Sequence, residues 1–340
     1  MPALKLELDA PVTGRLAVLD ELKGLAIVLV VLYHAGGVLV WNNYFHGDLG
    51  VDLFVILSGI SLALGSPSVN GRTFLLRRLR RIMPVYWIVL SLYWGLNTHF
   101  LQHQYSAFNL VIHYLGIHGW FGDFYAMAIN DSFWFITLIL TLYVLYCVLQ
   151  PLMSSPEKLM LAGAAFSLAV SLVLFYTGQA GTFGHMGLRI PGFFVGLLIG
   201  KLLKAGRLEL TLATPLALAV FLLTYVPYTQ GVIFASVVVG LGVMGAYLFI
   251  WKHLAPADVQ TSTARLLKFL GDHSLEIFLI HQPLIRNYNY YLLGRWFNDG
   301  SPSALSLIVG MVIGIGLTLL IGVELRAFMA RLSGRQAASS

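Results

Sequence analysis

Residues 22–40 read LKGLAIVLVVLYHAGGVLV, an apolar run with one histidine, His34, in its second half. A charged stretch, Asp20-Glu21-Leu22-Lys23, overlaps its start. As a helix, the run places His34 about 16 Å along the axis from Lys23, near the middle of an apolar layer about 30 Å thick. Polar groups at that depth usually face a protein interior or a wet cavity, and histidine exchanges protons near neutral pH. His34 is therefore the first candidate for chemistry.

The composition of the rest of the chain indicates a membrane protein. The sequence is 58% hydrophobic and only 11% charged, with a mean hydropathy of +0.80, far from a soluble average. The single cysteine, Cys147, excludes an internal disulfide framework and a cysteine-rich metal site. The net charge of +6 does not favour nucleic-acid binding, because the basic residues lie between apolar runs. Residues 1–18 do not resemble a secretory signal, so we interpret 22–40 as a retained first helix.

Hydropathy predicts an all-α, polytopic membrane bundle of about ten transmembrane helices. The ten expected spans cover approximately residues 21–40, 50–66, 83–100, 132–152, 159–176, 188–204, 210–227, 232–251, 267–285 and 304–323. With the N-terminus inside, 18 of the 21 basic residues fall on the cytoplasmic side, as the positive-inside rule requires. Both termini are therefore expected to be cytoplasmic.

The expected domain organisation is simple. Residues 1–20 form a cytoplasmic segment, residues 21–325 the membrane domain and residues 326–340 a cytoplasmic tail. The segment 101–131 fits less well, because its apolar stretch, residues 110–117, is too short to cross a bilayer. We expect it to be a re-entrant or interfacial piece on the outer side.

An arginine-rich cluster precedes the third expected span. Arg77, Arg78, Arg80 and Arg81 are four guanidiniums within five residues. They could grip phosphate groups through charge-assisted, bidentate bonds. Spacing alone favours a simpler interpretation, a topology anchor that also binds anionic lipid headgroups.

Acidic and imidazole side chains in other spans are further candidates. Asp48 suits a helix N-terminus, whereas Asp52 lies deeper and could orient His34 or form a structural hydrogen bond. Glu276 and His281 are five residues apart, about 140° around a helix, so they do not share a face. Both could line a passage or be satisfied hydrogen-bonding groups.

Two other patterns are interpreted structurally. The glycines Gly192, Gly196 and Gly200 recur every fourth residue and allow close helix approach. The histidines of the outer segment lack an acid or cysteine that would complete a ligand set, so no metal site is predicted. These histidines are His99, His103, His113 and His118.

Six motifs, in order along the chain, resemble the integral-membrane acyltransferase family 3. The motifs are residues 19–26 with Tyr33-His34, and residues 50–59, 77–86, 132–136, 189–196 and 274–281. The motifs are spread from residue 19 to residue 281, so the resemblance extends over nearly the whole chain. Six motifs in the same order are hard to attribute to chance.

The resemblance implies an enzyme of a bacterial inner membrane that transfers an acyl group, commonly acetyl, from cytoplasmic acyl-coenzyme A. The acceptor would be a hydroxyl of a cell-surface polysaccharide, another glycan or a lipid-linked sugar. Membrane lipid and glycan-assembly proteins are the expected partners, without nucleic acid and without a metal cofactor. His34 would be the essential histidine, with Asp52 beside it. The donor's phosphates would be held by Lys23, Arg77, Arg78, Arg80 and Arg81, and the candidate substrate-binding residues are Asp20, Glu21, Trp134, Arg189, Ser274, Glu276 and His281.

Two mechanisms remain open at this point. His34 could remove the proton of the acceptor hydroxyl as it attacks the thioester, with Asp52 orienting the ring or stabilising its positive charge. Alternatively, His34 could itself carry the acyl group in a two-step route. Arg189 would bind the acceptor or polarise the thioester oxygen.

Two departures from the family pattern and two rival functions complete the sequence analysis. The family often has arginine where Lys23 stands. Many sugar-modifying members also have a glutamate a few residues after the tryptophan that matches Trp134, and this chain lacks that glutamate.

A proton-coupled transporter would also need buried ionisable groups, but no matching halves are visible. A relative that has lost catalysis and serves in assembly or sensing is the third alternative.

Overall fold

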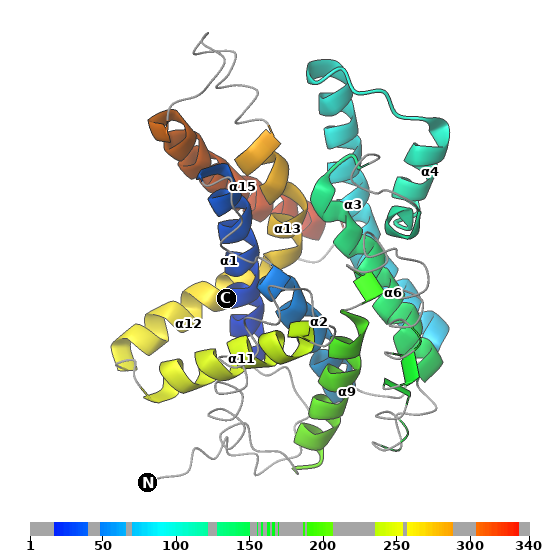
Figure 1. Ribbon diagram of the computed structural model, residues 1–340, viewed down its shortest axis with the longest axis vertical. Helices are drawn as coiled ribbons and strands as arrows, with labels where there is room; N and C mark the ends of the chain where they lie inside the picture. Colours follow the sequence, from blue (N-terminus) through cyan, green and yellow to red (C-terminus); the bar gives the residue numbers. More distant parts are fainter. Residues whose placement is uncertain are drawn as a thin grey trace. The chain divides into compact units, whose positions relative to one another are not determined.

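The computed structural model is all-helical over the residues that it describes (Figure 1). These are residues 17–39, 48–65, 70–121, 128–149, 189–206, 235–253, 257–287 and 304–332, with isolated positions between 155 and 187. They contain ten α-helices and no strand. The helices are α1 (Ala17–Leu39), α2 (Asp48–Leu64), α3 (Gly71–Phe100), α4 (Ala107–Tyr114), α6 (Trp134–Leu149), α9 (Ile190–Lys204), α11 (Ala235–His253), α12 (Ala257–Asp272), α13 (Ser274–Gln282) and α15 (Ala304–Leu332). The predicted all-α class is confirmed.

Two helical stretches in this part of the chain are long and apolar enough to cross a membrane, Asp131–Leu149 and Leu305–Leu332. Three more apolar helices are shorter, at Leu49–Leu64, Val237–Phe249 and Ser274–Ile285. The predicted spans 159–176 and 210–227 lie largely or wholly outside the described residues. The ten-span topology and the orientation of the termini therefore stay predictions.

Three helix boundaries differ from the sequence prediction. Helix α3 begins at Gly71, twelve residues before the predicted span, because the arginine-rich stretch is helical although it is not apolar. The predicted span 267–285 is divided at His273 into α12 and α13. Gly271 and Asp272, both weak helix formers, lie just before this break. Helix α15 continues to Leu332, beyond the expected start of the C-terminal tail.

The chain forms two compact units, each built from several segments. The first unit comprises Met1–Ala26, Asp48–Leu75 and Leu138–Gly271. The second unit comprises Ile27–Gly47, Leu76–Thr137 and Asp272–Ser340. Each is described separately below.

In the first unit, α2 packs closely on α9 (Figure 1). Gly59 of α2 meets the backbone of Phe193, and Gly196 of α9 meets the carbonyl of Ile56, so closely that neither position has room for a Cβ atom. A Cβ at Gly200 would lie 2.7 Å from the Ile60 oxygen. The close approach predicted from the spacing of these glycines is confirmed.

Gly196→Ala is expected to destabilise the protein by about 1–3 kcal/mol, because the added methyl group overlaps backbone atoms that cannot turn aside. The control is Gly316→Ala in α15, where an added Cβ meets no atom within 4 Å. Thermal unfolding of both purified variants in the same detergent measures the difference. Equal unfolding temperatures would contradict the close contact.

In the second unit, α4 is held on α3 by three side chains. The Tyr86 hydroxyl donates to the His113 carbonyl at 2.8 Å, the Trp87 indole donates to the Tyr114 carbonyl at 2.8 Å, and Ser91 pairs with the Tyr114 hydroxyl at 2.6 Å. Elsewhere in this unit α13 packs against α15, where a Cβ at Gly322 would lie 3.2 Å from the Ile277 side chain. These contacts fix α3 and α13, which carry several of the predicted site residues.

Candidate functional site

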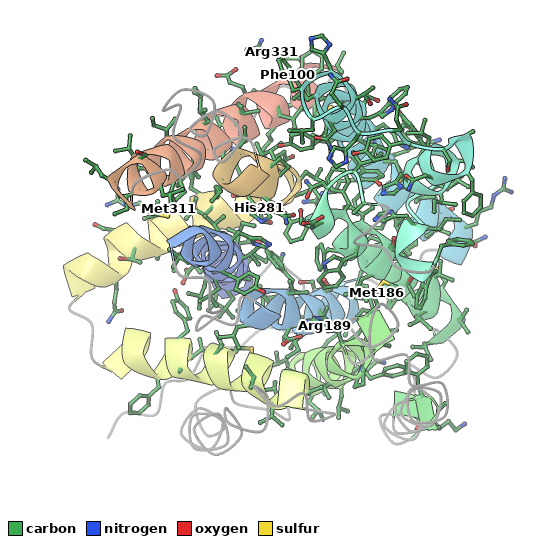
Figure 2. All side chains as sticks on the ribbon, turned by 45° about the horizontal axis from the view of Figure 1, so that its top comes forward. Phe100, Met186, Arg189, His281, Met311 and Arg331 are labelled. Carbon is green, nitrogen blue, oxygen red and sulfur yellow. The ribbon has the colours of Figure 1, made fainter. Side chains whose placement is uncertain are left out.

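Two histidines from distant parts of the chain meet in the second unit. The Nε2 atom of His281, on α13, lies 3.2 Å from Nδ1 of His34, on α1. The ring centroids are 4.7 Å apart and the planes are nearly perpendicular, at 72°. His281 has no exposed surface, and His34 is half-buried. Figure 2 shows His281 projecting from the end of α13.

Backbone carbonyls determine which nitrogens of this pair carry protons. The Nδ1 atom of His281 lies 2.7 Å from the Phe278 carbonyl, and Nδ1 of His34 lies 3.0 Å from the Val30 carbonyl. A carbonyl oxygen only accepts hydrogen bonds, so both Nδ1 atoms must be N–H donors. In the neutral rings both Nε2 atoms then carry lone pairs. The single Nδ1–H of His34 is then shared between the Val30 carbonyl and Nε2 of His281, and Nε2 of His34 is the basic nitrogen of the pair.

The predicted carboxylate Asp52 has a different partner in the first unit. Its Oδ1 atom lies 3.1 Å from Nε of Arg189, and both side chains are almost completely buried. Arg189 immediately precedes α9 (Figure 2), while Asp52 lies in the second turn of α2. A buried charge is stable only when it is paired, so these two residues depend on each other. The predicted contact of Asp52 with His34 stays a prediction.

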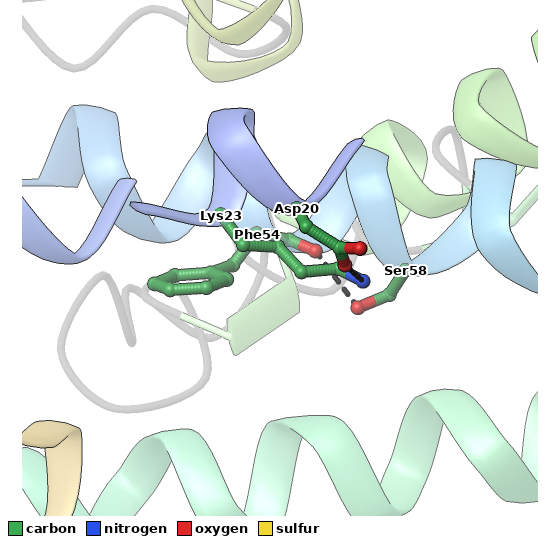
Figure 3. A network of polar contacts seen from close by, with 4 residues as sticks. All are labelled: Asp20, Lys23, Phe54 and Ser58. Atoms are coloured by element: carbon green, nitrogen blue, oxygen red, sulfur yellow. Dashed lines mark hydrogen bonds and ion pairs between the residues drawn. The ribbon is translucent and has the colours of Figure 1, made fainter. Parts of the chain in front are cut away.

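The acidic residues at the start of α1 form a second cluster in the first unit. Asp20 is buried and pairs with Lys23 at 3.3 Å, and Figure 3 shows this pair in one network with Phe54 and Ser58 of α2. The Oε2 atom of Glu21 accepts a hydrogen bond of 2.9 Å from the hydroxyl of Tyr247 on α11. The positive charge of Lys23 is thus offset by a neighbouring carboxylate.

The four arginines lie on one side of α3 in the second unit. At about 100° per residue they fall within about 160° of the helix circumference. Arg77, Arg80 and Arg81 are exposed and Arg78 is half-buried. This arrangement presents several guanidiniums to one ligand or surface, and it agrees with phosphate binding and with lipid anchoring.

Glu276, on α13, interacts electrostatically with one arginine of this cluster, Arg81. It lies in the first turn of α13 and is 8% exposed. Arg326 of α15, His273 and Arg81 all interact electrostatically with its carboxylate. Sequence reasoning missed Arg326, because its position just beyond a predicted span was explained by topology alone.

The comparison with known families decides the identity. The family model described as "Acyltransferase domain", the acyltransferase 3 model, matches residues 16–323. The chain belongs to the acyltransferase 3 family. The resemblance inferred from the six motifs is confirmed, and the match includes every site residue predicted from the sequence, whereas Arg326 lies just beyond it.

A curated relative agrees with this assignment to the acyltransferase 3 family. A protein of Komagataeibacter xylinus named as a membrane-bound transacylase, BcsY, is 26% identical over 201 residues. The alignment covers 54% of this chain and 50% of that protein, so the chain spans about half the length of the relative that it matches. No solved structure matches the chain.

The structure divides the predicted family site between the two units. The first unit contains Asp20, Glu21, Lys23, Asp52 and Arg189; the second contains His34, the four arginines, Trp134, Ser274, Glu276 and His281. Trp134 begins α6 and is 9% exposed, with its ring edge-on to Phe135. Ser274 begins α13 and is half-buried. His281 is in contact with His34, and its predicted role in substrate binding stays a prediction.

The remaining buried histidines among the described residues form a separate pair in segment 101–131. The rings of His113 and His118 stack at 4.1 Å with planes 10° apart, and both are nearly inaccessible. Burial lowers the pKa of His113 and lowers the pKa of His118 well below its usual value, so both rings are neutral at pH 7. No group of three or more potential metal-ligating side chains occurs among the residues that the structure describes.

Proposed function

We propose that the protein is an O-acyltransferase that moves an acyl group, acetyl in the simplest case, from acyl-coenzyme A to a sugar hydroxyl. The acceptor would be a cell-surface polysaccharide, another glycan or a lipid-linked sugar. The observation that carries the proposal is the His34–His281 pair, whose tautomers leave the lone pair of the half-buried His34 on Nε2. The family and the transacylase relative support acyl transfer as the reaction.

In the proposed reaction, Nε2 of His34 removes the proton of the acceptor hydroxyl as the oxygen attacks the thioester carbonyl carbon. The carbon–sulfur bond then breaks, and the coenzyme A thiolate leaves. The proton passes from His34 to this thiolate sulfur, so an ester and a free thiol are formed. The reaction requires no metal, and overall it neither takes up a proton from solution nor releases one.

His281 would stabilise the protonated state of His34. Because Nε2 of His281 faces the Nδ1–H of His34 at 3.2 Å, it accepts a hydrogen bond that strengthens when the ring becomes positive. The bond between Nδ1 of His281 and the Phe278 carbonyl holds the ring in the tautomer that can accept. This is the role that sequence analysis assigned to Asp52.

The donor would be held by the four arginines of α3, three of which are exposed and all of which are grouped on one side of that helix. In the proposed topology the protein crosses a bacterial inner membrane several times with both termini in the cytoplasm, so these arginines face the compartment that contains acyl-coenzyme A. Arg189, fixed by Asp52, would act on the acceptor. Membrane lipid and glycan-assembly proteins would be the partners of the protein.

Neutralising Arg77, Arg78, Arg80 and Arg81 to glutamine is expected to weaken donor binding about 100-fold. The estimate takes two lost charge-assisted contacts of about 1.5 kcal/mol each, or two factors of ten in the dissociation constant. Binding of coenzyme A and of dephospho-coenzyme A to the purified protein measures the effect. The control is Arg265→Gln with Lys268→Gln, which removes two exposed basic groups from α12. Unchanged binding would show that the cluster is a topology anchor.

The whole proposal is tested in vesicles that contain the purified protein. Labelled acetyl-coenzyme A is supplied outside or inside the vesicles with extracted envelope glycans or lipid-linked sugars as acceptors. Incorporation of label into an alkali-labile ester is the expected result. Proton-coupled solute flux without donor binding or turnover would overturn the enzyme proposal in favour of a transporter. Donor binding without turnover by any acceptor would favour a non-catalytic subunit.

A further inference from the structure

The C-terminal end of α13, where His281 lies, has a gap in its hydrogen bonding. In a helix the carbonyl of Leu279 would accept from the N–H of residue 283, but that residue is proline and has no N–H. Pro283 also begins a π-helical turn, Pro283–Asn287, which changes the bonding pattern at the same point. The carbonyl of Leu279 therefore needs a donor from elsewhere, and the carbonyls next to it can also take donors from side chains, because buried carbonyls are rarely left unpaired.

Two buried side chains supply these donors. The amide Nδ2 of Asn130 donates to the Leu279 carbonyl at 3.2 Å, and the hydroxyl of Tyr93 donates to the Ile280 carbonyl at 2.8 Å. Asn130 is 1% exposed and Tyr93 is 2% exposed. The two bonded carbonyls belong to the residues directly before His281. A third contact, 3.1 Å from Nε2 of Gln282 to Oδ2 of Asp131, lies directly after it.

These donors are themselves fixed by neighbouring elements of the second unit. Asn97, one turn after Tyr93 on α3, donates to the Ile129 carbonyl at 2.7 Å and so fastens the turn that carries Asn130. The Oδ1 atom of Asn130 accepts from both the backbone N–H and the hydroxyl of Ser132, at 3.0 and 2.8 Å. The Asn130 amide group therefore has one orientation, with Nδ2 directed at α13.

We propose that Tyr93 and Asn130 are positioning residues that set His281 against His34. The inference deepens the proposed function, on which it rests, because its effect on catalysis passes through the histidine pair. Neither residue needs to touch a substrate. The His281–His34 contact is a single hydrogen bond of 3.2 Å, and a displacement of about 1 Å would break it. Errors of this size in a catalytic group are costly even when they arise at a distance.

The test uses Tyr93→Phe and a matched control on the same helix, Tyr86→Phe. Both tyrosines are buried, both hydroxyls donate to a backbone carbonyl at 2.8 Å, and both rings pack against Phe133. Only Tyr93 binds a carbonyl beside His281. We expect Tyr93→Phe to lower kcat about tenfold with an unchanged KM for the donor, and Tyr86→Phe to leave kcat within about twofold at a similar cost in thermal stability. Equal kcat values for the two variants would overturn the inference.

A double-mutant cycle separates positioning from a general loss of structure. In an His281→Ala background, Tyr93→Phe is expected to cost less than twofold in kcat, because the group that it positions is gone. An undiminished tenfold loss in that background would show that Tyr93 acts by another route. Wild-type turnover in His281→Ala would instead contradict the proposed function of the pair.

The same comparison can be made without turnover. In protein labelled with ¹⁵N-histidine, the ring-nitrogen signals of His34 and His281 are identified by their loss in His34→Ala and in His281→Ala. Tyr93→Phe and Asn130→Ala are expected to shift both sets of signals, and Tyr86→Phe is expected to leave them in place. Unshifted signals in Tyr93→Phe would overturn the positioning role whether or not the protein is an acyltransferase.

Discussion

His34→Ala is expected to lower turnover about 100- to 10,000-fold, the usual contribution of a positioned general base, while donor affinity stays within about twofold. The loss follows from the tautomer assignment, because Nε2 of His34 is the nitrogen of the pair that carries the available lone pair. His99→Ala is the control, since His99 is exposed near the end of α3.

The measurement combines equilibrium binding of coenzyme A with the rate of label transfer from acetyl-coenzyme A. Turnover equal to that of His99→Ala would remove His34 from the mechanism.

A second measurement, the label that stays bound to wild-type protein after an acid quench, distinguishes the two chemical routes. Label that remains bound to the protein, and is absent from His34→Ala, would replace direct transfer by an acyl-histidine intermediate.

Asp52→Ala is expected to produce the largest loss of stability, about 3–5 kcal/mol, because it leaves the buried guanidinium of Arg189 without its carboxylate. The two groups lie 3.1 Å apart with almost no exposed surface. Thermal or denaturant unfolding in detergent measures the loss. Arg265→Ala is the control, since it removes an exposed arginine from α12.

The double variant Asp52→Leu with Arg189→Leu is expected to be more stable than Asp52→Ala, because it removes both charges together. Such coupling is characteristic of a buried ion pair. If the loss of stability in the double variant equals the sum of the losses in Asp52→Leu and Arg189→Leu, the two side chains are stabilised by different neighbours.

Patterns that depend on local spacing could be predicted from the sequence. The helical class follows from the long apolar runs, and the contact of α9 with α2 follows from Gly196 and its neighbours, since only glycine permits such an approach. The sequence prediction misses the boundary at His273, because it joins the apolar residues on both sides of Gly271-Asp272-His273-Ser274 into one span. The close approach of Gly271 to the Asp20 carbonyl is a contact between distant residues, and the sequence alone does not predict it.

Pairings between distant residues were beyond reach of the sequence. His34 and His281 are 247 positions apart, and neither lies in a motif that specifies the other. A carboxylate is the usual partner of a catalytic histidine, so Asp52 was the natural choice. Its pairing with Arg189 depends on the way α9 packs against α2. The hydroxyl of Tyr93 gave no signal either, because its partner, the Ile280 carbonyl, is 187 positions away in the sequence.

The two carbonyls that close the histidine pair also determine where a proton can travel. A proton that enters at Nε2 of His34 can be passed through Nδ1 to His281, but the far nitrogen of His281 already donates to the Phe278 carbonyl, which cannot carry a proton onward. The proton path through the pair therefore ends at His281 and does not continue across the membrane. Each proton must return by the nitrogen at which it entered, which suits an acid–base cycle on one substrate and does not suit coupling to a gradient.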